Sequence, residues 1–408
     1  MSSTQNPDWV QRLGDAGERL GEGLNTFMDR LRTFWQSVSE GQRVQELWFE
    51  FRAEAQASYK FYSKDVDWEA IGTKRGVWRS LKIGRALFWA MLMKLSPARR
   101  VFLLIACVFI VLATLGPGGP YIIMAIASLL FLLALELGDR VIMKRDLGIA
   151  REIQHWLVPE KPPQIPGLDI AFHTRPQNTV AGDYYDAFFR SEDPSTPASR
   201  RLLLVVADVA GKSVPAALLM ATFQASLQTL AAAPTTLLEL VLALNRYACA
   251  HSLGGARFTT AFLAELDLDT QALTYVSAGH NPPILRRASG AVERLHAGGL
   301  PLGIRATAVY ESGGSPLAPG DLLVIFTDGV VEAENDAGDE YGENRVLDVL
   351  CSSGPEPAES AAATLTRLMT SVDAFVGATR QHDDITCLVL RCQSTQPGSA
   401  GVSPAPSP

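Results

Sequence analysis

Four aspartates in the C-terminal half stand where an apolar run meets a turn: Asp183, Asp208, Asp328 and Asp383. A carboxylate at a strand end can enter a cleft, although a single one is more often a turn or capping residue. If the strands are neighbours, the carboxylates converge and repel one another unless protons or cations neutralise them. Oxygen ligands select Mg²⁺ or Mn²⁺. Two such ions about 3.5–4 Å apart can hold a phosphoryl group and activate a bridging water.

The elements that must position these aspartates alternate between strand-like and helical runs. Strands are predicted at residues 202–207, 260–266, 272–277, 322–326 and 385–390, and helices at 214–230, 236–250 and 358–376. Several of the strands are apolar almost throughout, which is typical of sheets covered on both faces. Strands mixed with long helices predict layered α+β packing.

Six motifs occur in order along residues 147–391. They are AREIQ at 150–154, AGDYYD at 181–186, ADVAGKSVPAA at 207–217, AGHNPP at 278–283, TDGV at 327–330 and DDIT at 383–386. Their order and spacing resemble those of the bacterial SpoIIE/RsbU-like serine/threonine phosphatases, a branch of the type 2C, or PPM-type, metal-dependent phosphatases. The resemblance implies an αββα two-sheet sandwich with two Mn²⁺ or Mg²⁺ ions between the sheets.

The resemblance also assigns the site. The positions that match metal ligands of the family are the side chains of Asp183, Asp208, Asp328 and Asp383 and the backbone carbonyl of Val209. The same four aspartates are the expected catalytic residues, and Asp384 is secondary. Ala181 and Ser213 stand where the family commonly has glycine, so we expect altered backbone geometry beside the ligands rather than loss of metal.

The expected reaction is one-step hydrolysis by a metal-activated hydroxide, without a phosphoenzyme. His280 and His382 are candidate proton donors to the leaving serine, and a metal-bound water is an alternative; for His280, holding its Gly/Pro turn is the favoured role. Arg175 is either a phosphate contact or, more simply, one half of a surface ion pair. By resemblance, the substrate is phosphoserine or phosphothreonine on a protein, expected to be an anti-sigma-factor antagonist.

Two other functions stay open. Gly211, Lys212 and Ser213 mimic the end of a P-loop, which would make the chain a nucleotide hydrolase, but that motif needs glycine where Val206 stands. The other alternative is a non-catalytic membrane scaffold that binds a regulatory partner. The complete carboxylate set argues against the scaffold.

The segment before this domain predicts membrane anchoring. Residues 101–135 contain no charge, and a Gly/Pro-rich stretch at 116–120 divides them into two apolar runs of about fifteen residues. A spanning helix needs about 20 residues, so each run needs part of its flanks; a buried hairpin in a soluble core is the alternative. Residues 74–100 hold eight Lys and Arg and no acid. The positive-inside rule therefore places both ends in the cytoplasm.

The whole chain divides into five expected segments. They are an amphipathic cytoplasmic helical region at 1–96, a transmembrane helical hairpin at 97–138, a connecting helix at 139–164 that mediates homodimerisation, the phosphatase domain at 165–393 and a disordered tail at 394–408. The expected location is the inner, cytoplasmic membrane, with both termini and the catalytic domain in the cytoplasm. The net charge of −7 and pI near 5.5 argue against nucleic acid as a partner.

Overall fold

The fold is taken from a computed structural model of the chain, which describes residue 63 and residues 77–116, 118–190, 200–251, 257–352 and 359–393. Most of the predicted N-terminal helical region and the predicted tail lie outside the described residues. The chain forms two compact units, Met1–Gly138 and Asp139–Pro408.

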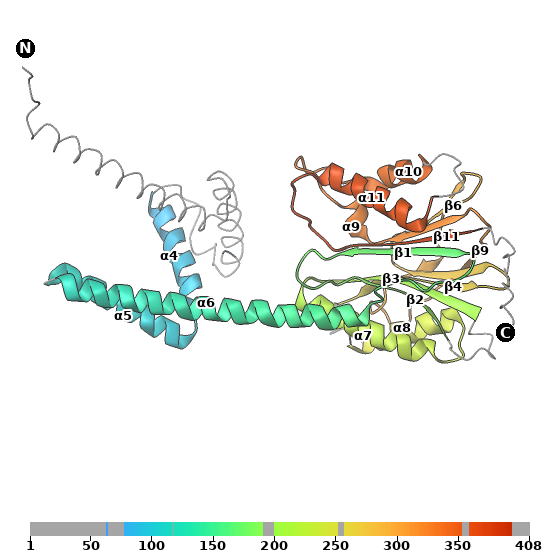
Figure 1. Ribbon diagram of the computed structural model, residues 1–408. Coiled ribbons are helices and arrows are strands. Elements are labelled where there is room, and N and C mark those ends of the chain that lie inside the picture. The colour runs from blue at the N-terminus through green and yellow to red at the C-terminus, as the bar shows by residue number, and fades with distance from the viewer. Residues whose placement is uncertain are drawn as a thin grey trace, which may run out of the picture. The chain divides into compact units, whose positions relative to one another are not determined.

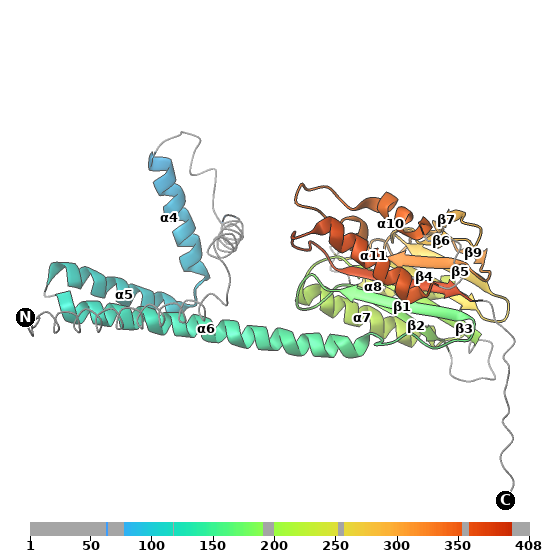
Figure 2. The ribbon, with the colours of Figure 1, turned by 45° about the horizontal axis from the view of Figure 1, so that its top comes forward.

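The first unit contains helix α4 (Val77–Lys94), helix α5 (Pro97–Leu115) and the first half of helix α6 (Gly118–Leu157). Helices α5 and α6 form a hairpin (Figure 2), in which Arg99 pairs with Glu136 at 3.0 Å and the rings of Phe102 and Phe131 lie 5.0 Å apart. Both are long and apolar enough to cross a membrane, and only 6% of each apolar window is buried. Exposed apolar surface on this scale is typical of helices that could span a membrane.

Among the described residues a third helix, α7 (Val214–Ala231), meets the same length and hydropathy criteria. Its inner face, however, carries Met220, Phe223 and Leu227, which are buried against a sheet of the second unit. The apolar character of α7 therefore belongs to the core of that unit.

The second unit is the predicted αββα sandwich (Figure 1). Sheet A consists, in spatial order, of β1 (Leu168–Arg175), β11 (Ile385–Cys392), β10 (Leu322–Phe326), β6 (Ile284–Arg286) and β7 (Val292–Arg294). Sheet B consists of β2 (Tyr184–Phe189), β3 (Arg201–Val209), β4 (Thr259–Asp267), β5 (Ala272–Ala278) and β8 (Gly298–Gly299), and β9 (Gly313–Pro316) also pairs with β5.

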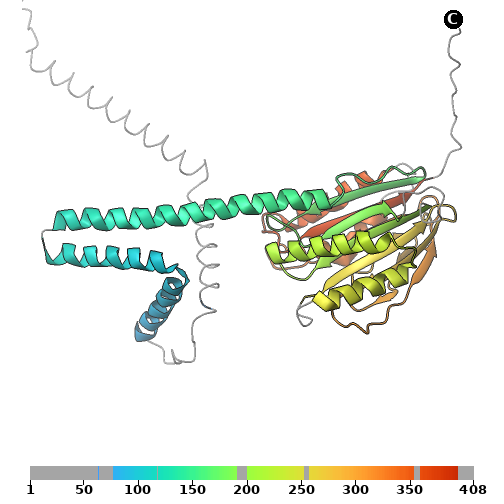
Figure 3. The same ribbon diagram turned by 90° about the horizontal axis from the view of Figure 1, so that it is seen from below.

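Helices cover the outer face of each sheet. Helices α7 and α8 (Leu237–His251) lie side by side on sheet B (Figure 3), and the outer face of sheet A carries α9 (Asp328–Val331), α10 (Gly342–Cys351) and α11 (Ala361–Val376). One core lies between the sheets, and a further core lies under each helix layer. Strand β3 shows why these strands are uniformly apolar: Leu203 packs under the helices, while Leu204 packs between the sheets.

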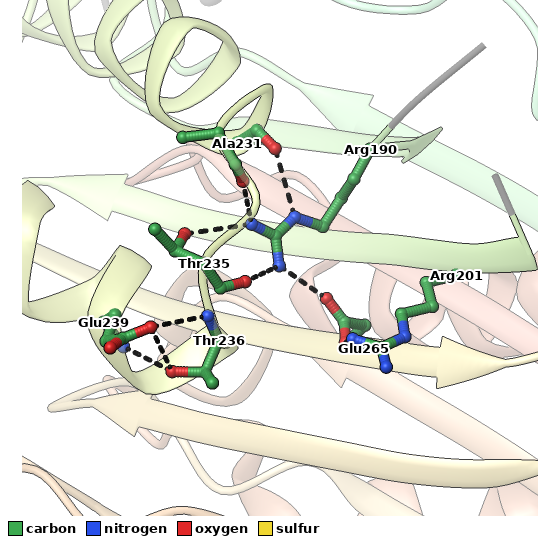
Figure 4. Close-up of polar contacts among 8 residues, drawn as sticks. Arg190, Arg201, Ala231, Thr235, Thr236, Glu239 and Glu265 are labelled. Carbon is green, nitrogen blue, oxygen red and sulfur yellow. Dashed lines mark hydrogen bonds and ion pairs between the residues drawn. The ribbon is translucent and has the colours of Figure 1, made fainter. Parts of the chain in front are cut away.

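A buried arginine joins sheet B to the end of α7 (Figure 4). Arg190 pairs with Glu265 at 2.9 Å and donates to the carbonyl oxygens of Ala231, Ala233 and Thr235. These carbonyls lie at or just after the helix C-terminus, where backbone acceptors lack helical partners. The guanidinium therefore stabilises the turn between α7 and α8.

Candidate active site

The structure brings the four predicted aspartates to one end of the sandwich, two from each sheet. Asp183 directly precedes β2, and Asp208 lies near the end of β3. The two strands are antiparallel neighbours in which Tyr184 pairs with Ala207, so the two aspartates lie at the same end of sheet B. Asp328 follows β10 and Asp383 precedes β11. Strands β10 and β11 are antiparallel neighbours in sheet A. The topology thus places all four at adjoining strand ends.

Three of these carboxylates have pKa values that are raised by burial and by the charges of their neighbours. Burial, and then the charges of Asp328 and Asp383, raise the pKa of Asp208 to about 7. Burial, and then Asp208, raise the pKa of Asp183 well above its ordinary value. For Asp328, burial and then Asp383 raise the pKa, while Lys212 opposes the shift. A group of acids with raised pKa values favours a bound proton or cation over full ionisation.

The donor set fits hard divalent ions. Its atoms are carboxylate oxygens together with the nearby backbone carbonyl of Val209, which lies 3.1 Å from the position a Cβ would take at Gly182. Across the described ranges, no three His, Cys, Asp or Glu side chains are gathered tightly enough to form one metal site by themselves. Mg²⁺ commonly binds only one or two protein carboxylates and keeps several waters. Two ions that share these carboxylates would therefore not need three of them around each ion.

Asp183 is held by threonines from the opposite sheet. The Thr327 hydroxyl donates to Asp183 Oδ2 at 3.0 Å and accepts the backbone N–H of Thr386 at 3.0 Å. The hydroxyls of Thr386 and Thr174 lie 3.0 Å apart. Asp183 is only 4% exposed, so these contacts orient a carboxylate that solvent scarcely reaches.

Asp384 holds the loop that carries Asp183. Its two carboxylate oxygens accept the backbone N–H groups of Gln177 and Gly182, each at 2.6 Å. With both oxygens engaged in this way, Asp384 has the geometry of a positioning residue, in line with the secondary role expected for it.

Two local backbone features explain the motif residues beside the ligands. A Cβ at Gly329 would lie 2.0 Å from the Asp384 carbonyl oxygen, so glycine allows Asp328 to approach the loop before β11. Ser213 has φ 62° and ψ −146°, a conformation that is essentially restricted to glycine. The departure from glycine at Ser213 therefore carries backbone strain next to Lys212.

Lys212 lies at the carboxylate cluster rather than in a phosphate-binding loop. Its Nζ atom lies 3.2 Å from Asp383 Oδ2 and donates to the His382 carbonyl oxygen at 2.5 Å. Val206, where a P-loop needs glycine, is fully buried inside β3. A regular strand has no room for a glycine cradle at that point, which removes the basis of the nucleotide-hydrolase alternative.

The two candidate histidines occupy different environments. His280 is buried, and burial lowers its pKa to about 4; its Nδ1 lies 3.3 Å from the Thr260 hydroxyl. This environment favours the structural role over proton donation. His382 is half exposed and pairs with Glu334 at 3.3 Å. Arg175 pairs with Asp373 at 2.5 Å, which is the surface ion pair of the simpler interpretation.

A cleft opens beside the carboxylates. Its lining includes Lys212, Gly329, His382 and Asp383, with Arg380 on its wall. The cleft holds both cationic and anionic side chains, and Asp383 is the member of the carboxylate cluster that lines it.

Sequence reasoning gave no role to several residues that position the site. Gln154 at the end of α6 holds Ala181 by two hydrogen bonds, in which its amide donates to the carbonyl at 2.6 Å and accepts the N–H at 2.9 Å. The motifs assign no role to Thr327 and Thr386 either. All three lie inside the recognised motifs, which was the available signal, but their partners are distant in sequence.

A two-sheet αββα sandwich with acidic residues gathered at one end of its strands defines a phosphatase of the PP2C type. A model of the family described as "Stage II sporulation protein E (SpoIIE)" matches residues 198–393. The phosphoserine phosphatase RsbU of Bacillus subtilis (strain 168) is 30% identical over 255 residues, covering 61% of this chain and 70% of RsbU.

Two more distant relatives are also phosphatases or PP2C domains. The phosphoserine phosphatase RsbP of the same organism is 26% identical over 194 residues, 46% of each chain. The SiaA-PP2C domain of Pseudomonas aeruginosa has the same fold, with a TM-score of 0.53 and 21% identity over 62% of this chain and 98% of that one. The chain belongs to the SpoIIE/RsbU family of PP2C-type phosphatases, and it is a protein serine/threonine phosphatase. Phosphatases of this type are metal-dependent.

Proposed function

We propose that the chain is a membrane-anchored phosphatase that hydrolyses phosphoserine or phosphothreonine on an anti-sigma-factor antagonist. The observation that supports it most is the gathering of Asp183, Asp208, Asp328 and Asp383 from both sheets. Burial and the charges of neighbouring carboxylates raise the pKa values of the first three. Such a cluster has little structural value without cations, because burying like charges destabilises a fold.

In this proposal the four carboxylates and the Val209 carbonyl hold two Mn²⁺ or Mg²⁺ ions. When bound, the ions supply an activated water and neutralise charge on the phosphoryl group. Thr327 orients Asp183, and Asp384 fixes the loop that carries it. Lys212 lies where its charge opposes the repulsion between Asp328 and Asp383. His382, at the cleft wall, is the accessible candidate for donating a proton to the leaving serine.

The decisive experiment compares Asp208→Asn and Asp328→Asn with Asp348→Asn, an exposed aspartate on α10 that serves as a matched control. Turnover of p-nitrophenyl phosphate with Mn²⁺ should be lost in the first two variants and on chelation, and kept in the control. Normal turnover in both site variants would refute the assignment. Retained binding of a phosphoprotein without turnover in the wild type would favour the non-catalytic scaffold.

The substrate can be found with the same variants. Phosphoproteins that accumulate in cells carrying Asp208→Asn, and that the purified wild type dephosphorylates, are the candidates. The proposal expects a small anti-sigma-factor antagonist among them. Accumulation confined to unrelated proteins would contradict that choice of substrate while leaving phosphatase activity intact.

We further propose that α6 couples the membrane segment to the site through a homodimer. The helix is continuous from Gly118 to Leu157, and Gln154 holds the peptide of Ala181 two residues before Asp183. Ile142, Ile149 and Trp156 expose 59%, 45% and 80% of their surface along this helix. An unpaired apolar face of this kind is typical of helices that pair with a second copy.

The coupling proposal is tested with Gln154→Ala, with exposed Glu152→Ala as the control, and with a double Ile149→Glu/Trp156→Glu variant. We expect Gln154→Ala to lower kcat and metal affinity while the particle mass stays unchanged. The double variant should halve the mass of the detergent-solubilised particle. Unchanged mass in the double variant would contradict dimerisation through α6, and unchanged kinetics in Gln154→Ala would contradict the coupling.

A further inference from the structure

Helix α4 has a charge and side-chain pattern that the phosphatase chemistry does not use. Its eighteen residues include Arg79, Lys82, Arg85 and Lys94 and no acid. The helix ends at Lys94, and the apolar helix α5 begins at Pro97. Wherever α5 enters a membrane, the end of α4 must therefore lie at that membrane's surface.

The corner between α4 and α5 is held by a specific side chain. Arg100, in the first turn of α5, donates through Nε to the carbonyl oxygens of Leu92 at 3.1 Å and Leu95 at 3.0 Å, and through Nη2 to that of Met93. These carbonyls lie at or just after the C-terminal end of α4, where α-helical partners run out, and that of Leu92 also accepts the Leu95 N–H at 3.2 Å. Arg100 thereby stabilises the change of direction seen in Figure 2, where α4 runs across the line of the hairpin.

One face of α4 combines cations with aromatic rings. Lys82, Arg85 and Trp89 fall at helical spacing i, i+3 and i+7, and Phe88 lies one turn after Arg85. Phe88 and Trp89 expose 52% and 56% of their surface, whereas Ala90 on the opposite side is buried. A helix that only packed on its neighbours would turn its large rings inward, so this face is suited to an environment that is partly apolar and partly anionic.

We propose that α4 is an interfacial helix that docks on anionic phospholipid headgroups of the membrane spanned by the hairpin. The inference rests on the membrane anchoring proposed above. Aromatic rings favour the headgroup level of a bilayer, and Lys and Arg stems extend along apolar surface while their charges reach phosphates. Anionic lipids attract a basic segment that adjoins a membrane helix. An acidic protein partner would satisfy the cations but leave the exposure of the Phe88 and Trp89 rings without a reason.

The test uses the full chain in nanodiscs of phosphatidylcholine alone or of phosphatidylcholine mixed with phosphatidylglycerol. Amide hydrogen exchange is followed in α4 and, separately, in α5. We expect exchange in Val77–Lys94 to slow several-fold in the mixed lipid, and added salt to reverse the effect because it screens the attraction. The double variant Lys82→Glu/Arg85→Glu should lose this lipid-dependent protection. Phe88→Ser/Trp89→Ser should weaken it in the mixed lipid.

A matched control changes the same charge on the second unit, with Lys161→Glu/Arg305→Glu at two exposed positions. Helix α4 of this variant should behave as in the wild type. Turnover of p-nitrophenyl phosphate verifies that each variant is folded. Equal α4 exchange in both lipids while α5 stays protected would overturn the inference and leave the anchoring intact. Unprotected α5 in both lipids would refute the anchoring and the inference with it. Protection of α4 that depends on protein concentration but not on lipid would also overturn it, in favour of a second copy.

Discussion

The hydroxyl of Thr327, which follows β10 in sheet A, donates to Oδ2 of Asp183, which leads into β2 of sheet B. This bond links the two sheets at the carboxylate cluster. Thr327 is fully buried and has a second contact, from the Thr386 N–H. The position of Asp183 therefore depends on sheet A, although its own strand belongs to sheet B.

Replacing Thr327 by Val keeps the volume and removes the hydroxyl. Hydrogen bonds to charged groups contribute about 1.5–3 kcal/mol, so we expect kcat/KM and Mn²⁺ affinity to fall by about tenfold or more. Thr327→Ser should restore most of both. Calorimetric Mn²⁺ titration and steady-state kinetics measure the effect; a serine variant as impaired as the valine variant would show that packing, not the hydroxyl, matters.

The raised pKa of Asp208 predicts how pH affects the chelated, metal-free protein. The folded-state pKa is about 7 against an ordinary 3.8, so between these values the folded form binds more protons than the unfolded form. This contribution to stability is present at low pH and is lost as pH rises through about 7. We expect Asp208→Asn to remove it, as measured by the Tm of both proteins across this range. The same difference in Tm at every pH would contradict the shift.

The pKa of His280 is lowered, so its effect on the pH dependence of stability is opposite to that of Asp208. Its folded-state pKa is about 4 against 6.5 when unfolded, so the unfolded form binds more protons between those values. Stability from the neutral imidazole is present above pH 6.5 and declines as pH falls towards about 4, by about 3 kcal/mol at most. His280→Asn should flatten this acid-side decline in denaturant unfolding. Exposed His296→Asn is the control, and an unchanged decline in the His280 variant would refute the burial argument.

Arg190 is predicted to be the most costly ion-pair residue to remove. Its side chain is 4% exposed and is paired with Glu265, so Arg190→Met leaves that buried carboxylate with Arg201 as its remaining arginine partner and removes the donor to the carbonyls of Ala231, Ala233 and Thr235. Breaking a buried pair by removing one partner costs about 3–5 kcal/mol, and we expect the lower end of that range because Arg201 stays beside the carboxylate. Arg200→Met, whose pair with Asp269 is exposed, should change little. Thermal unfolding of both variants tests this, and equal small effects would show that water replaces the lost contacts.

The strands and helices that the sequence predicted best are the ones buried on both faces, such as β3 and β11. The prediction missed β1 and β2, whose residues include His173, Arg175 and Asp186 and so lack a continuous apolar run. It also missed α10, a short helix with an apolar face of only a few residues, Val346 and Leu350 among them. In these elements the tertiary environment outweighs the local pattern.

The sequence alone determined a layered α+β domain and the apolar hairpin, because residue type, order and periodicity are local properties of the chain. Its motifs supplied the αββα class and the candidate carboxylates through their resemblance to a known family. Only the tertiary structure decided which groups hold those carboxylates: Thr327 for Asp183, Asp384 for the loop before it, and Gln154 for Ala181. A hydrogen bond between residues more than twenty positions apart depends on strand order and register. Those follow from packing the whole sandwich, and no short motif contains them.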